Sequence, residues 1–140
     1  MHPLVRSFLA VLAGIVVGGI VNMALIFLNT FVALPPDIDR NDQVAMSAAF
    51  ADAPPSALIL VLLAHSGGTL VGAWLAAKLA GRAPLTHGLI IGVWFLLGGI
   101  LSIFMIRSPA WFIPVDLLLY LPAAWLGAKL AGPGKRAFPA

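Results

Sequence analysis

The sequence predicts an all-α polytopic membrane protein, an antiparallel bundle of four transmembrane helices that forms a single membrane domain over residues 1–140. Three observations favour this fold. Apolar and aromatic residues make up 61% of the chain, charged residues make up only 9%, and the mean hydropathy is +1.06. A soluble domain carries roughly 25% charged residues, so this chain has too few charges to cover a water-exposed surface. The absence of cysteine excludes disulfides and thiol chemistry.

Long uncharged runs place the four helices. A helix needs about 20 apolar residues to cross a bilayer, and the runs predict spans at about 4–28, 56–80, 85–106 and 110–131. Because the runs are continuous rather than alternating, they are typical of helices and not of β-strands. The first run is longer than the core of a signal peptide, which has about 7–15 residues, so we expect it to be a membrane anchor.

One connection is much longer than the others. The sequence predicts an outer loop at about 30–55, between the first and second spans. Within it, Asn41 or Asp42 could cap a short helix that continues through Phe50, because both residue types accept hydrogen bonds from the first amides of a helix. The other two connections are short, so the remaining spans should follow one another as tight hairpins.

Basic residues indicate how the chain is oriented, because lysine and arginine accumulate in cytoplasmic loops. If the N-terminus is inside, six basic residues face the cytoplasm and two face outward. The six are Arg6, Lys78, Arg82, Lys129, Lys135 and Arg136, and the two are Arg40 and Arg107. The sequence therefore predicts a multi-pass protein of the bacterial inner (cytoplasmic) membrane, with both termini cytoplasmic. The bilayer is its expected surrounding, and the scattered basic residues form no patch for nucleic acid.

Two internal matches predict a duplicated helical hairpin. Residues 74–81 (WLAAKLAG) and 125–132 (WLGAKLAG) agree at seven of eight positions, 51 residues apart. A weaker match relates residues 18–22 to residues 98–102, 80 residues apart. The matches predict two parallel hairpin repeats, spans 1+2 and spans 3+4, related by a pseudo-twofold axis along the membrane normal.

The same alignment predicts a polar site in the outer half of the bundle. The stronger match pairs His65 with Asp116, which are the ionisable residues furthest inside the predicted spans. The weaker match pairs Asn22 with Ser102. Helical spacing adds Thr69, four residues after His65, and Tyr120, four residues after Asp116. We therefore expect a ligand- or proton-binding site formed by His65, Asp116, Asn22, Ser102, Thr69 and Tyr120.

The His65/Asp116 pair has two interpretations. A charge at the bilayer centre costs about 2.5–3.5 kcal/mol on insertion scales, so Asp116 needs a partner, water or a proton. His65 is a suitable partner and can carry a proton near neutral pH. The pair could bind a proton or a small polar solute from the outer side. It could equally be a structural hydrogen bond that fixes how two helices pair.

Several function classes follow from these patterns. The first is an integral membrane protein that binds or moves a proton or small polar solute; the alternative is a non-catalytic accessory or scaffold subunit of a larger membrane complex. An enzyme acting on lipid is less favoured, because no nucleophile elbow is present. The segment Asp37-x-Asp39-x-Asn41 lacks the glycine and glutamate that complete a calcium loop. We expect no catalytic residue, no metal and no cofactor.

Pairs of glycines four residues apart indicate close helix contacts. They are Gly14/Gly18, Gly68/Gly72 and Gly88/Gly92. Such pairs let membrane helices approach closely, so they could drive a homodimer or pack the helices of one chain against one another.

Overall fold

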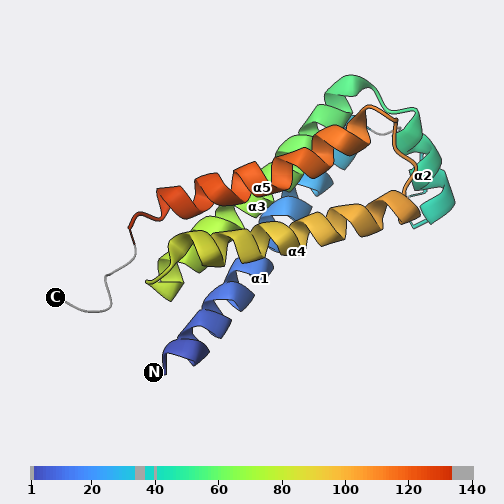
Figure 1. Ribbon diagram of the computed structural model, residues 1–140. Helices are drawn as coiled ribbons and strands as arrows, with labels where there is room; N and C mark the ends of the chain where they lie inside the picture. The colour runs from blue at the N-terminus through green and yellow to red at the C-terminus, as the bar shows by residue number, and fades with distance from the viewer. Residues whose placement is uncertain (1, 34–36, 40, 134–140) are drawn as a thin grey trace.

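The computed structural model describes residues 2–33, 37–39 and 41–133, which form helices joined by turns and short connections (Figure 1). Its helices are α1 (Pro3–Ala33), α2 (Gln43–Ala51), α3 (Pro55–Ala80), α4 (Pro84–Met105) and α5 (Phe112–Leu130). All except α2 are long and apolar enough to cross a membrane. The prediction of four long apolar helices and of no strands is confirmed for this part of the chain. Arg40, Lys135 and Arg136, which entered the orientation argument, lie outside the described residues.

The short helix α2 begins where the sequence predicted a cap. The Oδ1 atom of Asp42 accepts hydrogen bonds from the backbone amides of Val44 at 2.8 Å and Ala45 at 3.2 Å. These are amides that have no partner within the helix, so the carboxylate stabilises its first turn. Asp42, and not Asn41, is therefore the cap of α2.

Helix α3 is the centre of the bundle. Successive long helices run in opposite directions, and α3 packs against α1, α4 and α5 (Figure 1). Helix α5 also packs against α4, whereas α1 contacts α4 only slightly. The bundle is therefore built around one central helix, and α1 and α4 lean away from each other.

Close contact between α1 and α3 depends on glycine. A Cβ atom added to Gly18 would lie 2.7 Å from the carbonyl oxygen of Gly68, and one added to Gly72 would lie 2.6 Å from the carbonyl oxygen of Gly14. Real Cβ atoms do not approach backbone oxygens so closely, so any side chain here would push the helices apart.

The pair Gly88/Gly92 has the same role between α4 and α5. A Cβ on Gly88 would meet the methyl group of Ala128 at 2.6 Å, and one on Gly92 would meet Ala124 at the same distance. All three glycine pairs thus pack helices of one chain against one another. Of the two roles predicted from their spacing, this is the role that the structure shows.

The stronger internal match relates positions that are alike in burial. Ala73 and Ala124 are both fully buried, and Ala77 and Ala128 are only 3% and 1% exposed. These residues lie 51 apart in the sequence, as the alignment requires. Burial therefore agrees with the relation of α3 to α5.

The weaker match does not describe how α1 and α4 pack. Gly18 lies against α3, but its aligned partner Gly98 has no atom near the position that a Cβ would take. Conversely, Gly99 packs against the ring of Tyr120, while its aligned partner Gly19 is open. The packed positions differ by one residue from the alignment, which is a rotation of about 100° around a helix. The duplicated hairpin stays a prediction.

Adjacent glycines in α1 give a test of this packing. Gly18→Ala should lower the free energy of unfolding by about 1–3 kcal/mol, because its methyl group overlaps the α3 backbone. Gly19→Ala should leave stability unchanged or raise it slightly, since alanine favours helix and nothing lies within 4 Å. Thermal unfolding in detergent compares the two. Equal stabilities would contradict the close α1–α3 contact.

Candidate functional site

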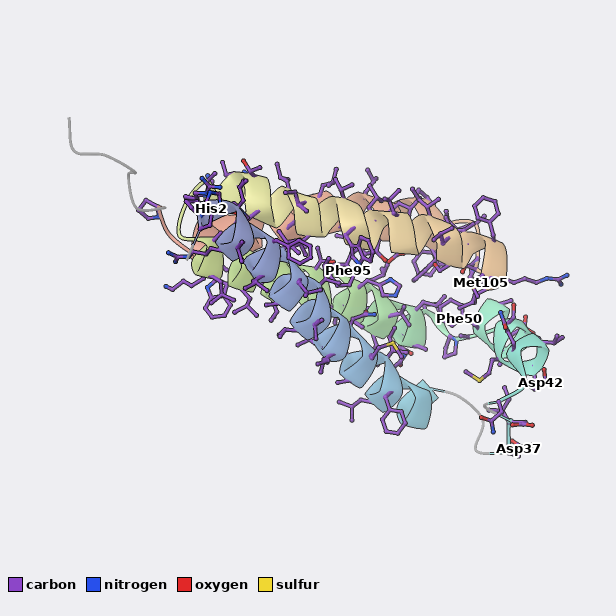
Figure 2. The ribbon with its side chains drawn as sticks, turned by 90° about the horizontal axis from the view of Figure 1, so that it is seen from below. His2, Asp37, Asp42, Phe50, Phe95 and Met105 are labelled. Atoms are coloured by element: carbon purple, nitrogen blue, oxygen red, sulfur yellow. The ribbon has the colours of Figure 1, made fainter. Side chains whose placement is uncertain are left out.

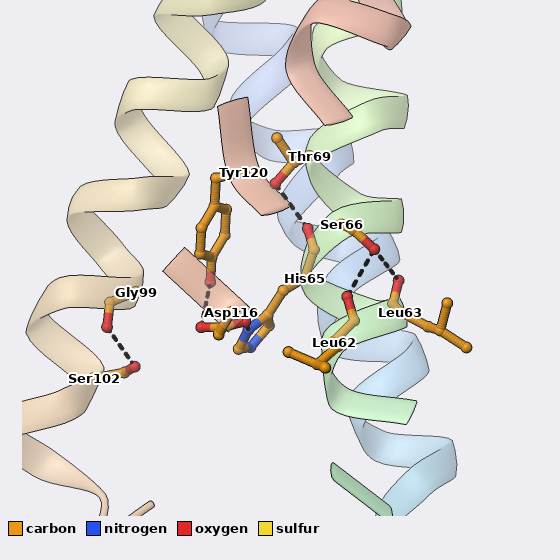
Figure 3. A network of polar contacts seen from close by, with 9 residues as sticks. All are labelled: Leu62, Leu63, His65, Ser66, Thr69, Gly99, Ser102, Asp116 and Tyr120. Carbon is orange, nitrogen blue, oxygen red and sulfur yellow. Dashed lines mark hydrogen bonds and ion pairs between the residues drawn. The ribbon is translucent and has the colours of Figure 1, made fainter. Parts of the chain in front are cut away.

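The polar centre of the bundle is an imidazole in contact with a carboxylate. His65 lies near the middle of α3 and Asp116 in the second turn of α5, and Nδ1 of the imidazole is 2.7 Å from Oδ1 of the carboxylate (Figure 3). The two helices approach closely further along, where Gly127 packs against the backbone carbonyl of Leu70. This contact keeps α3 and α5 close enough for the two short side chains to meet.

Tyr120 completes the surroundings of the carboxylate. It lies one helical turn after Asp116, and its hydroxyl donates to Oδ2 at 3.3 Å. Its ring stacks on the imidazole of His65, with centroids 5.8 Å apart and planes inclined by 24°. Gly99 of α4 leaves room for this ring, since a Cβ there would lie 2.8 Å from it. Both oxygens of Asp116 are therefore bonded, in a side chain that is only 4% exposed.

Thr69 serves its own helix and does not bond the pair. Its hydroxyl donates to the backbone carbonyl oxygen of His65 at 2.7 Å, one turn earlier, and the residue is fully buried. Ser66, beside His65, donates in the same way to the carbonyl oxygen of Leu62 at 2.7 Å (Figure 3). Thr69 therefore supports the backbone that carries the imidazole.

A cavity of about 340 Å³ opens beside His65 at the end of the bundle where α2 lies. Every helix contributes to its wall. Its lining residues are Ile26, Asn29, Gln43, Met46, Ser47, Phe50, Ala53, Ala57, Val61, His65, Ser102, Met105, Ile106, Ser108 and Phe112. Figure 2 shows Phe50 of α2 and Met105 of α4 at this end. Asp116 and Tyr120 are not part of the lining, so His65 separates the carboxylate from the cavity.

The structure divides the six residues that were predicted to share a site. His65, Asp116 and Tyr120 form one bonded group, and Ser102 lies with His65 on the cavity wall. Asn22 is not in the lining. It packs against Gly68 at the α1–α3 contact, and its Oδ1 is buried without a hydrogen bond in the described part of the chain.

The cavity also contains polar residues that the sequence argument missed. Asn29 donates from Nδ2 to the carbonyl oxygen of Ala57 at 3.1 Å, while its Oδ1 is buried and has no partner among the described residues. It lies seven residues, or two turns, after Asn22 on the same face of α1, so helical spacing could have found it. The cavity positions of Gln43 and Ser47 depend on where α2 docks, and no local pattern indicates that.

The arrangement leaves one ring nitrogen of His65 available. Nδ1 contacts Asp116, and Nε2 makes no hydrogen bond within the described ranges. When Nδ1 carries the proton and faces the carboxylate, Nε2 is an acceptor; when the ring is protonated, Nε2 becomes a donor. The imidazole can therefore exchange a proton, or accept a hydrogen bond, on the side away from Asp116.

Comparisons of this chain with known protein families, with curated proteins and with solved structures give no match. The function of this chain is therefore inferred from the site itself.

The bonding of the carboxylate can be tested by removing one hydroxyl. Tyr120→Phe should lower the free energy of unfolding by about 1–3 kcal/mol, because a buried carboxylate oxygen then has no donor. Ser66→Ala is the matched control, since its hydroxyl bonds only a carbonyl of its own helix. Thermal unfolding in detergent measures both. The Tyr120–Asp116 bond would be refuted if the two variants were equally stable.

Proposed function

We propose that this chain is an integral protein of the bacterial inner membrane, with a polar site in its outer half that binds or moves a proton or a small polar solute. The observation that carries the proposal is the position of His65, which contacts the buried carboxylate of Asp116 on one side and lines the cavity on the other. An intramembrane ionisable pair beside a cavity is a candidate functional site by default.

The outer surface of the helices supports placement in a bilayer. Large apolar side chains project from the long helices, and among them Phe104 is 83% exposed and Leu118 is 73% exposed. Soluble monomers rarely expose continuous apolar surface of this kind, whereas lipid tails would cover it. We infer that these side chains face the hydrocarbon region.

The charges at the two ends of the bundle support the orientation. Arg6 donates to the carbonyl oxygen of Leu79 at 2.7 Å, and Arg82 donates to the hydroxyl of Ser7 at 3.2 Å, so basic residues gather where α1 begins and α3 ends. Figure 2 shows Asp37 at the opposite end. By the positive-inside rule, the termini are cytoplasmic and the cavity lies on the outer side.

The site has the parts that a proton-binding group needs. Nε2 of His65 is the group that would exchange a proton with the cavity, and the carboxylate of Asp116 would stabilise the imidazolium that results. Tyr120 would hold the second carboxylate oxygen in place throughout. Among the described residues the lining contains no lysine, arginine, aspartate or glutamate, so none of these residues offers another charged side chain for that role.

Proton movement can be measured with the purified protein in liposomes that contain a pH-sensitive dye. After an external acid pulse, wild-type vesicles should acidify faster than empty ones. Asp116→Asn should reduce this additional rate by about tenfold or more, because the imidazolium loses its counter-charge, and a tenfold effect corresponds to about 1.4 kcal/mol. Ser66→Ala should match the wild type. Equal rates for Asp116→Asn and wild type would end the proposal that this pair moves protons.

A second candidate function is a non-catalytic accessory or scaffold subunit. An apolar groove runs between α1 and α4, which contact each other only slightly, and its lining includes Val11, Ile15, Leu89, Val93, Trp94 and Leu97. A helix of a larger membrane complex, or of a second copy of this chain, would fit such a groove. The groove is the observation that favours this function.

Because the chain contains no cysteine, a single introduced cysteine can test the groove. A photo-crosslinker attached to Val93→Cys should give an adduct of one defined mass in native membranes if a partner helix occupies the groove. The same reagent on Leu118→Cys, which lies on α5 and is also exposed, should not. Lipid adducts alone at both positions would refute the scaffold function.

A further inference from the structure

We propose that the solute of the His65/Asp116 site is a neutral amphiphile, with an apolar body and a hydroxyl group that donates a hydrogen bond to the cavity wall. This inference rests on the proposed function, because it uses the same site. It replaces the small polar solute of that proposal with a molecule that is mainly apolar and has a hydroxyl as its polar group.

The shape and lining of the cavity favour an apolar body. The volume of about 340 Å³ is within the range of small-molecule pockets. Its wall contains Val61 and Met105, and it is closed at one side by Phe50 and Phe112, whose rings meet edge to face at 5.7 Å. Such a wall gains little from contact with a sugar or a small ion, because a fully polar solute would lose its hydration without compensation.

The charges around the cavity exclude an ionic group on the solute. Within the described ranges, no lysine, arginine, aspartate or glutamate lines it. The nearest carboxylate, Asp116, is buried and has both oxygens bonded, to His65 and Tyr120. An ammonium or a carboxylate in the cavity would therefore be desolvated without a counter-charge, which is far more costly than burying a neutral hydroxyl.

Three residues of the wall have groups that can accept a hydrogen bond from the solute. Asn29 is 9% exposed, uses its Nδ2 on Ala57, and has a buried Oδ1 without a described partner. Nε2 of His65 is an acceptor when the ring is neutral and its proton is on Nδ1, facing Asp116. Ser102 also lines the cavity, and because its hydroxyl donates to the carbonyl oxygen of Gly99 at 2.7 Å, its oxygen can still accept a hydrogen bond. These acceptors lie on three different helices around the cavity, and a solute hydroxyl can donate its single hydrogen to one of them at a time.

The deciding experiment compares two probes, of which one has a hydroxyl hydrogen and the other has a methyl group in its place. Full-length protein in lipid nanodiscs is titrated calorimetrically with 1-naphthol and with 1-methoxynaphthalene, and empty nanodiscs correct for partitioning into lipid. The methyl ether keeps the ring and the oxygen but cannot donate. We expect 1-naphthol to bind about tenfold more tightly, the effect of one hydrogen bond. Naphthalene probes that carry a carboxylate or a quaternary ammonium should bind no better than the ether.

Variants locate the binding site. Asn29→Leu removes one acceptor and should reduce the preference for 1-naphthol over its ether by threefold or more, whereas Ser66→Ala should preserve it, because Ser66 does not line the cavity. If Asn29→Leu does not fold, the comparison of probes on the wild-type protein still decides. Equal affinities, no binding of 1-naphthol, or tighter binding of a charged probe would overturn the inference.

The same preparation separates this inference from the proposed function. If acidification of liposomes depends on Asp116 but 1-naphthol shows no preference over its ether, the site moves protons and only the solute class is wrong. If 1-naphthol is preferred but acidification is independent of Asp116, the cavity binds the solute and proton movement is wrong. If neither result appears, both proposals fail.

Discussion

The structure depends on the burial of one carboxylate among apolar helices. Asp116 is 3% exposed, and a charge or an unbonded oxygen at that depth would destabilise the fold by several kcal/mol. His65 and Tyr120 bond its two oxygens and also stack on each other. The need to bond both oxygens of Asp116 fixes how α3 and α5 are rotated about their axes. It also explains why α4 has a glycine, Gly99, where the ring of Tyr120 must fit.

Packing is tight at one end of the bundle and open at the other. Toward the turn between α3 and α4, residues such as Gly92, Ala73 and Ala124 bring the helices into close contact. At the opposite end the core consists of larger side chains, including Leu58 and Phe112, and α2 covers it without burying any of its own residues. Small side chains permit close approach of helices. Larger side chains keep the helices further apart, and the space between the helices at this end contains the cavity.

The two proposed functions use different surfaces of the same bundle. The interior site joins an ionisable pair to a cavity whose wall, in the described part of the chain, carries amide, hydroxyl and imidazole groups but no lysine, arginine, aspartate or glutamate. The exterior groove between α1 and α4 is apolar and faces outward. The groove lies between α1 and α4, which contact each other only slightly, whereas the cavity lies at the end of the bundle where α2 packs.

The sequence by itself determined the four long helices, since a run of about 20 apolar residues is a local property that needs no knowledge of neighbours. It also narrowed the cap of α2 to Asn41 or Asp42, of which the structure shows Asp42, and it paired His65 with Asp116, which the structure brings into contact. Only the tertiary structure decided that Asn22 packs against α3 while Ser102 lines the cavity, and that α2 forms part of the cavity wall. A shift of one residue turns a helix face by about 100°, and the docking of α2 depends on contacts between residues far apart in the chain, so no local pattern specifies either.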